Sequence, residues 1–256
     1  MMKKLLRFIL PSKLFATTSR TGRLAARLRY RMHTHIGKYP FIIFPLYRLV
    51  GVYQDQIVNS STELVIEGFP RSSSTFCYSA FQCAQGRPVK IATHLHVPAH
   101  PIRACRLRIP TLVLIRHPRD AVSSAMVRES YMSLNVFLER YLVFYKSLEP
   151  YKNKVVLADF KEVTSDFSTV IERINDKFHK NYDLLEYTEE NLDQIQCVLS
   201  LRDKAIGGMV SKSYSPNPMK ELSKNQIDFT KCEKKLKECE EIYKRYLQQI
   251  VLARGS

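Results

Sequence analysis

The sequence contains no run of 18 or more apolar residues, so we do not expect a helix that is apolar over the length needed to span a bilayer. The apolar stretch at residues 5–10 is interrupted by Arg7 and is too short for the apolar region of a signal peptide. Internal repeats and low-complexity tracts are absent as well. With 256 residues, 45% of them hydrophobic, the chain is long enough to bury a sizeable core without cross-links.

Acidic residues are absent before Asp55, and the net charge of +16 is therefore unevenly placed. The acid-free segment carries eleven basic residues: Lys3, Lys4, Arg7, Lys13, Arg20, Arg23, Arg27, Arg29, Arg31, Lys38 and Arg48. The rest of the chain has 29 basic residues against 24 acidic ones, a net charge of +5. We expect residues 1–55 to be a basic, helical N-terminal appendage and residues 56–256 to form a single α/β domain.

The basic segment at residues 1–38 is compatible with three interpretations. We favour a helix that lies peripherally on an anionic membrane, because basic and apolar residues alternate there. An organelle transit peptide and a solvated helix that folds onto the body remain open. The apolar stretch at residues 39–53 is interrupted by Pro45, and we expect it to be buried or interfacial.

The cysteines lack any C-x-x-C pair and any Cys/His zinc pattern. Reduced, partly buried thiols in a cytoplasmic protein are therefore favoured over a disulfide framework. The six are Cys77, Cys83, Cys105, Cys197, Cys232 and Cys239.

Beyond residue 63, apolar runs of strand length alternate with helical stretches. Strands are predicted at 64–66, 90–95, 111–115 and 155–157, and helices at 76–84, 119–130, 133–148, 163–180, 192–201 and 231–251. A loop is predicted at 207–218. Strands separated by helices indicate βαβ units and a mainly parallel central sheet flanked by helices. Ligands of such sheets bind beyond the carboxyl ends of the strands.

A polar turn follows the first predicted strand, in the stretch ELVIEGFPRSSST. A strand, a polar loop and a helix N-terminus bind phosphate well, because the first N–H groups of the helix lack partners and its dipole favours an anion. Arg71 adds a guanidinium group, and further donors come from Ser72, Ser73, Ser74 and Thr75. An ordinary surface turn capped by serine is the alternative interpretation of this stretch. The loop lacks the G-x-x-x-x-G-K-[ST] pattern, so it is not a Walker A motif.

A second anion site is indicated by LVLIRHPRDAVSS, where a buried strand ends at Arg116 and the next helix carries Ser124. These two side chains can converge on one anion. A structural ion pair between Arg116 and a carboxylate is the alternative. We expect Arg119 and Asp120 to cap or solvate the start of the helix.

A third stretch, KIATHLHVP, places His94 and His96 two residues apart, on one side of a strand if the strand continues that far. Histidine is suited to accept a proton near neutral pH. Structural roles and metal ligation are alternatives, but no third metal ligand is apparent. His100 follows in a proline-rich loop and has no assigned role.

Together these stretches resemble the cytosolic-type sulfotransferases over residues 63–180. The stretch from Phe69 to Phe76 is similar to that family's 5′-phosphosulfate loop, with Arg71 in place of Lys, Ser73 in place of Gly and Phe76 in place of Trp. Arg116 and Ser124 match its 3′-phosphate motif, and His94 matches its catalytic histidine.

The sequence also departs from the family's pattern. Ala92 stands where the family has a Lys, for which Lys90 is a possible substitute, and Phe160 stands near an adenine-contacting Tyr. The family's late Arg-Lys-Gly and Gly-Asp-Trp-Lys elements are missing, and Gly207, Gly208 and Lys212 occupy that region.

The resemblance implies a P-loop NTPase-like fold and transfer of a sulfuryl group from 3′-phosphoadenosine 5′-phosphosulfate (PAPS) to a hydroxyl or amine, leaving 3′-phosphoadenosine 5′-phosphate (PAP). His94 would be the general base, with His96 as the alternative, and Arg71 would stabilise the leaving group. Ser72, Ser73, Ser74 and Thr75 would hold the 5′-phosphate, and Arg116 and Ser124 the 3′-phosphate. Phe76 or Phe160 would pack on the adenine. By family analogy no metal is required.

Two other functions stay open. A kinase-like phosphotransferase on the same architecture would need magnesium and a nucleoside triphosphate. A non-enzymatic protein could instead bind membrane or nucleic acid through its basic N-terminus, although we expect no specific nucleic-acid partner. The sequence leaves the acceptor undefined among glycans, lipids, and small alcohols or phenols.

Overall fold

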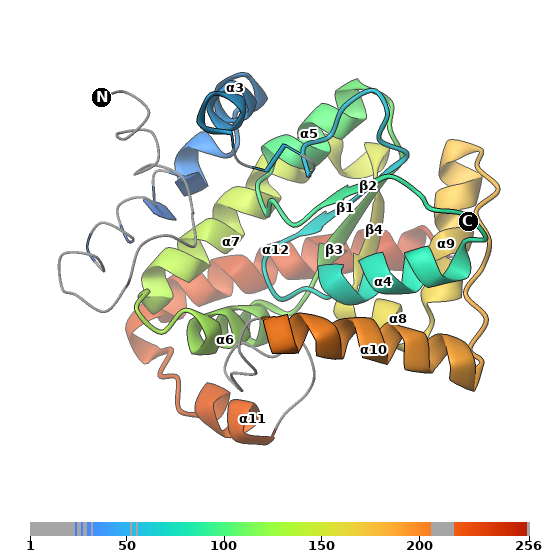
Figure 1. The fold of residues 1–256 in the computed structure, drawn as a ribbon. Coiled ribbons are helices and arrows are strands. Elements are labelled where there is room, and N and C mark those ends of the chain that lie inside the picture. Colours follow the sequence, from blue (N-terminus) through green and yellow to red (C-terminus); the bar gives the residue numbers. More distant parts are fainter. Residues whose placement is uncertain are drawn as a thin grey trace.

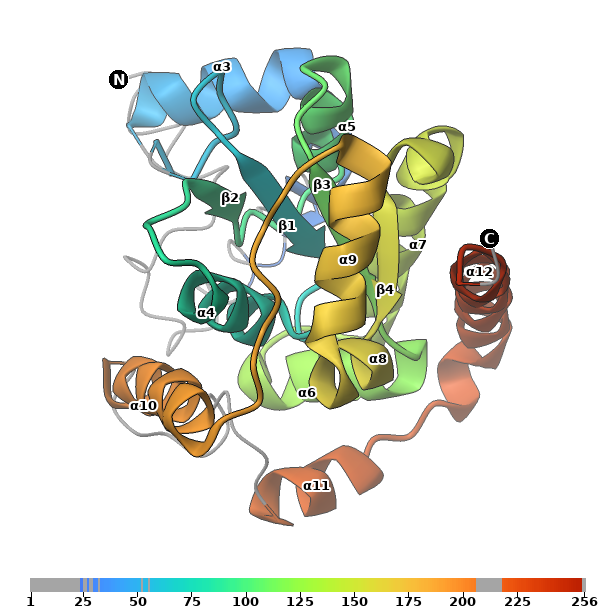
Figure 2. The same cartoon turned by 90° about the vertical axis from the view of Figure 1, so that its right-hand side faces the viewer.

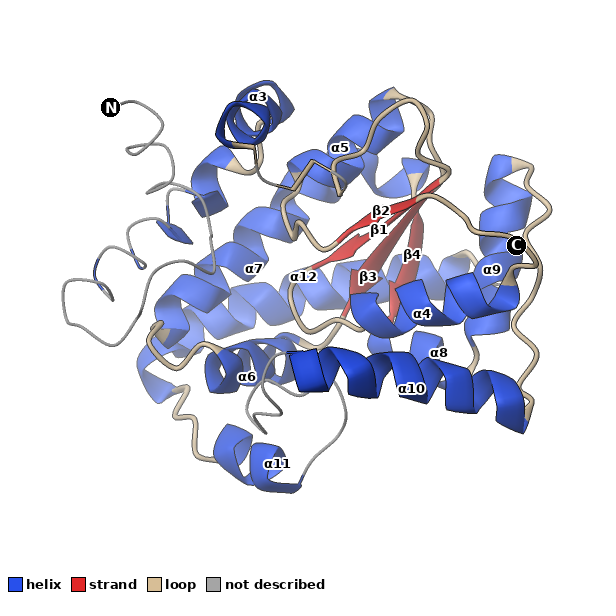
Figure 3. Cartoon of the chain, in the orientation of Figure 1, coloured by secondary structure: helices blue, strands red, loops and turns tan. Residues whose placement is uncertain are grey.

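The computed structural model describes residues 24, 27, 30, 31, 33–51, 53, 54, 56–205 and 218–254. Its centre is a four-stranded sheet in the order β2-β1-β3-β4, with every neighbouring pair parallel. Helices flank this sheet on both sides (Figure 1, Figure 3). The strands are β1 (Leu64–Gly68), β2 (Ile91–Thr93), β3 (Thr111–Ile115) and β4 (Val156–Asp159). The predicted α/β class with a parallel sheet is confirmed.

The helices connect these strands and extend beyond them. They are α3 (Pro40–Val50), α4 (Ser74–Ala84), α5 (Ala99–Arg106), α6 (Pro118–Arg128), α7 (Leu134–Leu148), α8 (Phe160–Ser165), α9 (Phe167–Phe178), α10 (Glu189–Ala205), α11 (Pro218–Asn225) and α12 (Glu233–Leu252), with short 3₁₀ turns η1 (Glu149–Lys154) and η3 (Thr230–Cys232).

The strands bury both faces, as expected for a sheet covered by helices on each side. Ile66 and Leu114 face a core formed with α4, α9 and α10, whereas Val113 and Leu157 face a core formed with α6, α7 and α12. Figure 2 shows α4 and α9 on one side of the strands and α7 and α12 on the other. Successive residues of a strand point to opposite faces, so each short apolar run supplies both cores.

The chain changes direction across the sheet between β1 and β3. It passes from β1 to β2 on one side and then crosses to β3 on the other side of β1. The connections that leave the carboxyl ends of β1 and β3 diverge to opposite faces, and this divergence is the usual ligand crevice of open α/β sheets. Gly68 allows the two strands to approach there, because a Cβ atom on Gly68 would lie 2.6 Å from the carbonyl oxygen of Leu114.

Several element boundaries differ from the predicted ones. The helix predicted at 163–180 is two helices, because the Asp166 side chain accepts the backbone N–H groups of Ser168 and Thr169 and starts a new helix. The prediction of a proline-rich loop after His96 is wrong, because this segment forms α5. Pro218 begins α11, a position that proline favours, and residues 207–217 of the predicted loop lie outside the described residues.

The apolar segment at residues 39–53 forms α3, and Pro45 lies inside this helix. Ile43, Phe44 and Tyr47 are buried against the body beside Leu95 and Val97. Most of the basic segment at residues 1–38 lies outside the described residues. Across the part of the chain that the structure describes, no helix combines the length and apolarity needed to cross a membrane.

Candidate functional site

Two loops meet at the carboxyl ends of β1 and β3. One runs from Phe69 to Ser73 and leads into α4, and the other is the turn at Arg116 and His117 that leads into α6. Because β1 and β3 are paired neighbours, the parallel topology brings both loops to the same edge of the sheet. The two sequence motifs predicted to bind anions are therefore adjacent.

The first loop has a strained backbone. Arg71 has φ of 72° and Ser73 has φ of 73°, both in the left-handed region. For residues other than glycine this conformation costs about 1–2 kcal/mol, and such strain is concentrated at functional sites. Ser73 adopts the conformation that glycine would favour, and glycine is the residue of the resembling family at this position.

The N-terminus of α4 is left without a carboxylate. Its N-cap Ser73 makes no side-chain capping bond, and the first turn contains no acidic residue. The side chains of Ser74 and Thr75 are buried in that turn, and Ser72 is fully buried before it. The backbone donors of the first turn are thus oriented toward the loop, as at anion-binding helix termini.

Two arginines connect the loops. Arg71 Nε donates a hydrogen bond to Ser124 Oγ on α6 at 2.9 Å. Arg116 Nη1 donates to the carbonyl oxygen of Arg71 at 3.0 Å. The hydroxyl of Tyr141 in turn donates to the carbonyl oxygen of Arg116 at 2.9 Å. Arg71, Arg116 and Ser124 form one connected cluster although they are far apart in the sequence.

The guanidinium of Arg116 retains capacity for an anion. Its Nε is buried and has no hydrogen-bond partner among the described residues. Within that same part of the chain it forms no ion pair within 4.0 Å, so the alternative of a structural ion pair is not realised there. Burial lowers the pKa of Arg116, and the nearby carboxylates of Asp120, Glu221 and Asp159 offset only part of this effect. Phe160 supports the group from one side, with Cζ 3.8 Å from the ring centroid.

The charge pattern around this site was missed in the sequence reading. No acidic residue occurs between Glu67 and Asp120, a stretch that contains the first loop, α4, β2, α5 and β3. The basic residues in this stretch are Arg71, Arg87, Lys90, Arg103, Arg106, Arg108, Arg116 and Arg119. Of these, Arg71 and Arg116 lie in the two loops and Arg119 lies in the first turn of α6, so these three contribute positive charge at the edge where both loops lie.

The two histidines lie just beyond β2, not on it. The expectation that they share one side of a strand is wrong, because His94 has φ of 66° and His96 has φ of 51°, and such a backbone turns instead of extending. His94 Nε2 lies 3.1 Å from Thr75 Oγ1, a hydrogen bond that places its ring beside the first turn of α4. His96 Nδ1 bonds the carbonyl oxygen of Gly68 at 2.9 Å, so its proton lies on Nδ1 and Nε2 is an acceptor.

Glu67 holds the histidine-bearing turn in place. Its fully buried carboxylate accepts the N–H of Leu95 at 2.8 Å, the N–H of His96 at 3.0 Å and Nδ1–H of His100 at 2.9 Å. His100 presents Nδ1–H because its Nε2 accepts the N–H of Val58 at 3.0 Å. The sequence signal that could have identified Glu67 was a carboxylate inside an apolar strand, followed by several histidines.

Burial and hydrogen bonding shift the pKa values of Glu67 and His96 in this network. Burial alone would raise the pKa of Glu67, but the hydrogen bond from His100 and the nearby histidine rings outweigh burial and lower that pKa. Burial lowers the pKa of His96, which keeps its imidazole neutral over a wider range of pH. A neutral imidazole has the lone pair that a general base requires.

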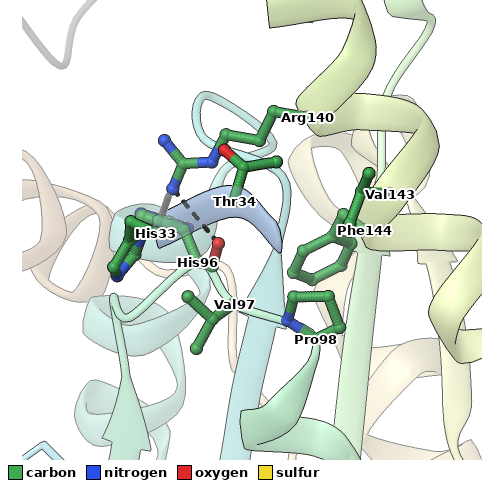
Figure 4. A pocket seen from close by; sticks show the side chains of 8 residues that line it. All are labelled: His33, Thr34, His96, Val97, Pro98, Arg140, Val143 and Phe144. Atoms are coloured by element: carbon green, nitrogen blue, oxygen red, sulfur yellow. Dashed lines mark hydrogen bonds between the residues drawn. The ribbon is translucent and has the colours of Figure 1, made fainter. Parts of the chain in front are cut away.

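A small hollow borders the turn that carries His96. It is lined by His33, Thr34, His96, Val97, Pro98, Arg140, Val143 and Phe144 (Figure 4). Arg140 Nη2 donates to the carbonyl oxygen of His96 at 3.1 Å, the dashed contact in Figure 4. This contact and the hydrogen bond from the His96 N–H to Glu67 together hold the backbone of His96.

Other predicted site residues have separate environments. Phe76 packs into the core against Phe167, with ring centroids 6.4 Å apart, whereas Phe160 lies under Arg116. Gly207, Gly208 and Lys212 lie outside the described residues. In the part of the chain that is described, no three His, Cys, Asp or Glu side chains are grouped as a metal site.

No family model matches the chain, and no curated protein matches its sequence. Among solved structures, mouse sulfotransferase SULT7A1 complexed with PAP is similar over 81% of this chain and 92% of that chain, with 14% sequence identity and a TM-score of 0.45. At this level the similarity identifies no function, so the residues of the site must carry it.

Proposed function

We propose that this chain transfers a sulfuryl group from PAPS to a hydroxyl or amine of an acceptor. The observation that carries the proposal is the cluster of Arg71, Ser124 and Arg116, with the buried Nε of Arg116 unpartnered among the described residues. PAPS has phosphate at both the 5′ and the 3′ position of its ribose, and the cluster joins two loops that each suit an anion.

The two phosphates would be held by different elements. The N–H groups at the start of α4 and the hydroxyls of Ser72, Ser73, Ser74 and Thr75 would bind the 5′-phosphate. Arg116 and Ser124 would bind the 3′-phosphate, and this contact would select PAPS over adenosine 5′-phosphosulfate. A charge-assisted contact of this kind contributes about 1.5–3 kcal/mol.

His94 would be the general base. Its Nε2 contacts Thr75 in the first turn of α4, so the base would lie next to the proposed 5′-phosphate position. In the transfer, a new S–O or S–N bond forms to the acceptor, the bond from sulfur to the bridging oxygen breaks, and the acceptor's proton moves to His94 Nε2. Arg71 would stabilise the negative charge that develops on the leaving phosphate.

His96 is the alternative candidate for the general base. Its Nδ1–H bonds Gly68, and its Nε2 is oriented as an acceptor. Glu67 would then act as a positioning residue for either histidine, because it fixes the turn that carries both. The acceptor class remains a glycan, a lipid, or a small alcohol or phenol.

Thermal unfolding with added nucleotides tests this proposal. PAP at a hundred times its dissociation constant should add about 2.7 kcal/mol to the free energy of unfolding. We expect stabilisation by PAP in magnesium-free buffer and a smaller effect of adenosine 5′-phosphosulfate. Stabilisation by magnesium and ATP alone, with none by PAP, would replace the proposal with a phosphotransferase.

A further inference from the structure

Helix α3 is apolar on both of its faces. Its inner residues Ile43, Phe44 and Tyr47 pack against the body and are fully buried. Its outer residues are also large and apolar, with exposed fractions of 80% for Phe41, 52% for Ile42 and 48% for Leu49. A surface helix normally presents polar residues to water, whereas no described residue of the chain covers this outer apolar face.

The neighbouring end of α5 extends this apolar face and surrounds it with positive charge. Leu107, just after α5, is 44% exposed. The guanidinium of Arg106 lies 5.0 Å from the ring centroid of Phe41, which links the two helices. Arg48 and Arg108 are exposed beside them. We call the exposed residues Phe41, Ile42, Leu49, Leu107, Arg48, Arg106 and Arg108 the α3 face.

The charge of the α3 face decides between two occupants. No acidic residue occurs in α3, in α5 or anywhere before Asp55. A second copy of the chain docked through this face would bring arginines against arginines with no carboxylate of either helix to pair them. An anionic lipid surface instead accepts exposed aromatic and aliphatic side chains in its interfacial layer and pairs the arginines with phosphate and carboxylate headgroups.

We propose that the α3 face docks the protein on an anionic membrane surface, with Phe41, Ile42 and Leu49 entering the headgroup region and Arg48 and Arg106 contacting the headgroups. This surface is formed by elements other than the basic segment at residues 1–38. Figure 2 shows α3 at the opposite end of the sheet from α6 and α8, although the inner face of α3 packs against the turn that carries the histidines, beside Leu95 and Val97. The proposal concerns the outer face of α3 and is read out by vesicle binding, so it is tested separately from PAP binding.

Tryptophan fluorescence tests the docking directly, because the natural sequence contains no tryptophan. In the full chain, Phe41→Trp places one indole on the α3 face, and Phe41 is exposed enough for the core to stay intact. We expect a blue shift of this indole with phosphatidylcholine vesicles that contain phosphatidylserine, and none with phosphatidylcholine alone. Leu252→Trp, at an exposed position of α12, is the control that should not shift.

Paired variants then separate the two contributions. Phe41→Ser/Ile42→Ser should lower vesicle partitioning by about tenfold or more, whereas the matched pair Val251→Ser/Leu252→Ser should leave it unchanged. Arg48→Gln and Arg106→Gln should each lower it roughly fivefold on anionic vesicles.

Three results would overturn the proposal. The first is a shift of Phe8→Trp on vesicles without any shift of Phe41→Trp, which would assign binding to the N-terminal segment. The second is a shift of Phe41→Trp that depends on protein concentration without vesicles, which would assign the face to a second copy of the chain. The third is unchanged partitioning of Phe41→Ser/Ile42→Ser.

Discussion

The carboxyl ends of β1 and β4 lie at the same edge of one parallel sheet, yet they are built differently. After β4, Asp159 caps α8 by accepting the N–H of Lys161 at 3.0 Å, and Glu162 completes a capping box. The Glu162 carboxylate also pairs with Arg173 at 2.5 Å and Arg254 at 2.8 Å. At this end the carboxylates and the first helix donors are matched within the protein, although the buried Nε of Arg173 has no hydrogen-bond partner among the described residues.

After β1 and β3 the helix starts lack side-chain caps, although Asp120 lies in the first turn of α6. Neither α4 nor α6 has a side-chain cap bond at its N-cap, and the Nε of Arg116 is buried without a partner in the described part of the chain. Arg71 and Ser73 hold left-handed backbone conformations there. The difference teaches that the β4 end stabilises the fold, whereas the β1–β3 edge retains donors and positive charge that an anionic ligand can use.

The largest effect should follow the loss of His94. His94→Ala removes the proposed base and should lower turnover by roughly 10²–10⁴-fold. Turnover with saturating PAPS and an accepted substrate is the measurement, and His179→Ala, at the exposed end of α9, is the control. A near-normal rate of His94→Ala would move the role of base to His96.

Arg116→Ala tests the β1–β3 edge, where donors and positive charge are available to a ligand. It should weaken PAP binding by about 1.5–3 kcal/mol, because a charge-assisted contact to the 3′-phosphate is lost. Isothermal titration calorimetry measures the affinity. Arg119→Ala removes a nearby exposed arginine that stacks on Phe229 and should leave the affinity unchanged. Equal affinities of the two variants would remove Arg116 from the phosphate site.

Glu162→Gln tests the matched side. It breaks ion pairs to two arginines and should lower the free energy of unfolding by about 2 kcal/mol, measured by urea denaturation. PAP affinity should stay the same, since Glu162 contacts neither loop of the site. Glu233→Gln, in an exposed pair with Lys237, should change stability by less than about 0.5 kcal/mol. Weaker PAP binding by Glu162→Gln would mean that the carboxyl end of β4 contributes to the ligand site at the β1–β3 edge.

Stability should also depend on pH through His96. Its pKa is lower in the folded state than the ordinary value near 6.5, so the unfolded chain binds more protons and stability falls as pH decreases below about 6.5. One such group changes the free energy of unfolding by at most about 1.4 kcal/mol per pH unit. His96→Asn should flatten urea-derived stability between neutral and mildly acidic pH, and an unchanged slope would contradict the burial of a neutral His96.

The smallest effect concerns the strained loop. Ser73→Gly should raise the free energy of unfolding by a few tenths of a kcal/mol up to about 1, because glycine adopts the left-handed conformation without steric cost. Ser79→Gly, inside the same helix, should instead lower it by about 1 kcal/mol. Thermal unfolding of both variants gives the comparison, and destabilisation by Ser73→Gly would show that the serine side chain outweighs the strain.

The sequence was sufficient for the sheet and for the meeting of Arg71, Arg116 and Ser124. Short apolar runs identified the strands, and parallel connectivity then required their carboxyl ends to share one edge. Because the two motifs follow neighbouring strands, their adjacency did not depend on any side-chain detail.

Other features depend on tertiary contacts that local patterns do not contain. The strand predicted at 90–95 ends at Thr93, because the buried carboxylate of Glu67 binds the backbone of Leu95 and His96 and the chain turns there. The same carboxylate binds His100 and so supports α5. The prolines of that segment favour a loop prediction, so the sequence pattern did not indicate this helix. The amphipathic period through 163–180 correctly predicted helix, but the capping side chain of Asp166 divides this stretch into two helices.

The most direct test of the central claim is calorimetric titration of the native protein with PAP and with adenosine 5′-monophosphate, which lacks only the 3′-phosphate. We predict that PAP binds at least about tenfold more tightly, the difference of a charge-assisted contact, and that Arg116→Ala abolishes this preference. Equal affinity for the two nucleotides, or a preference that survives Arg116→Ala, would contradict a 3′-phosphate site at the β1–β3 edge.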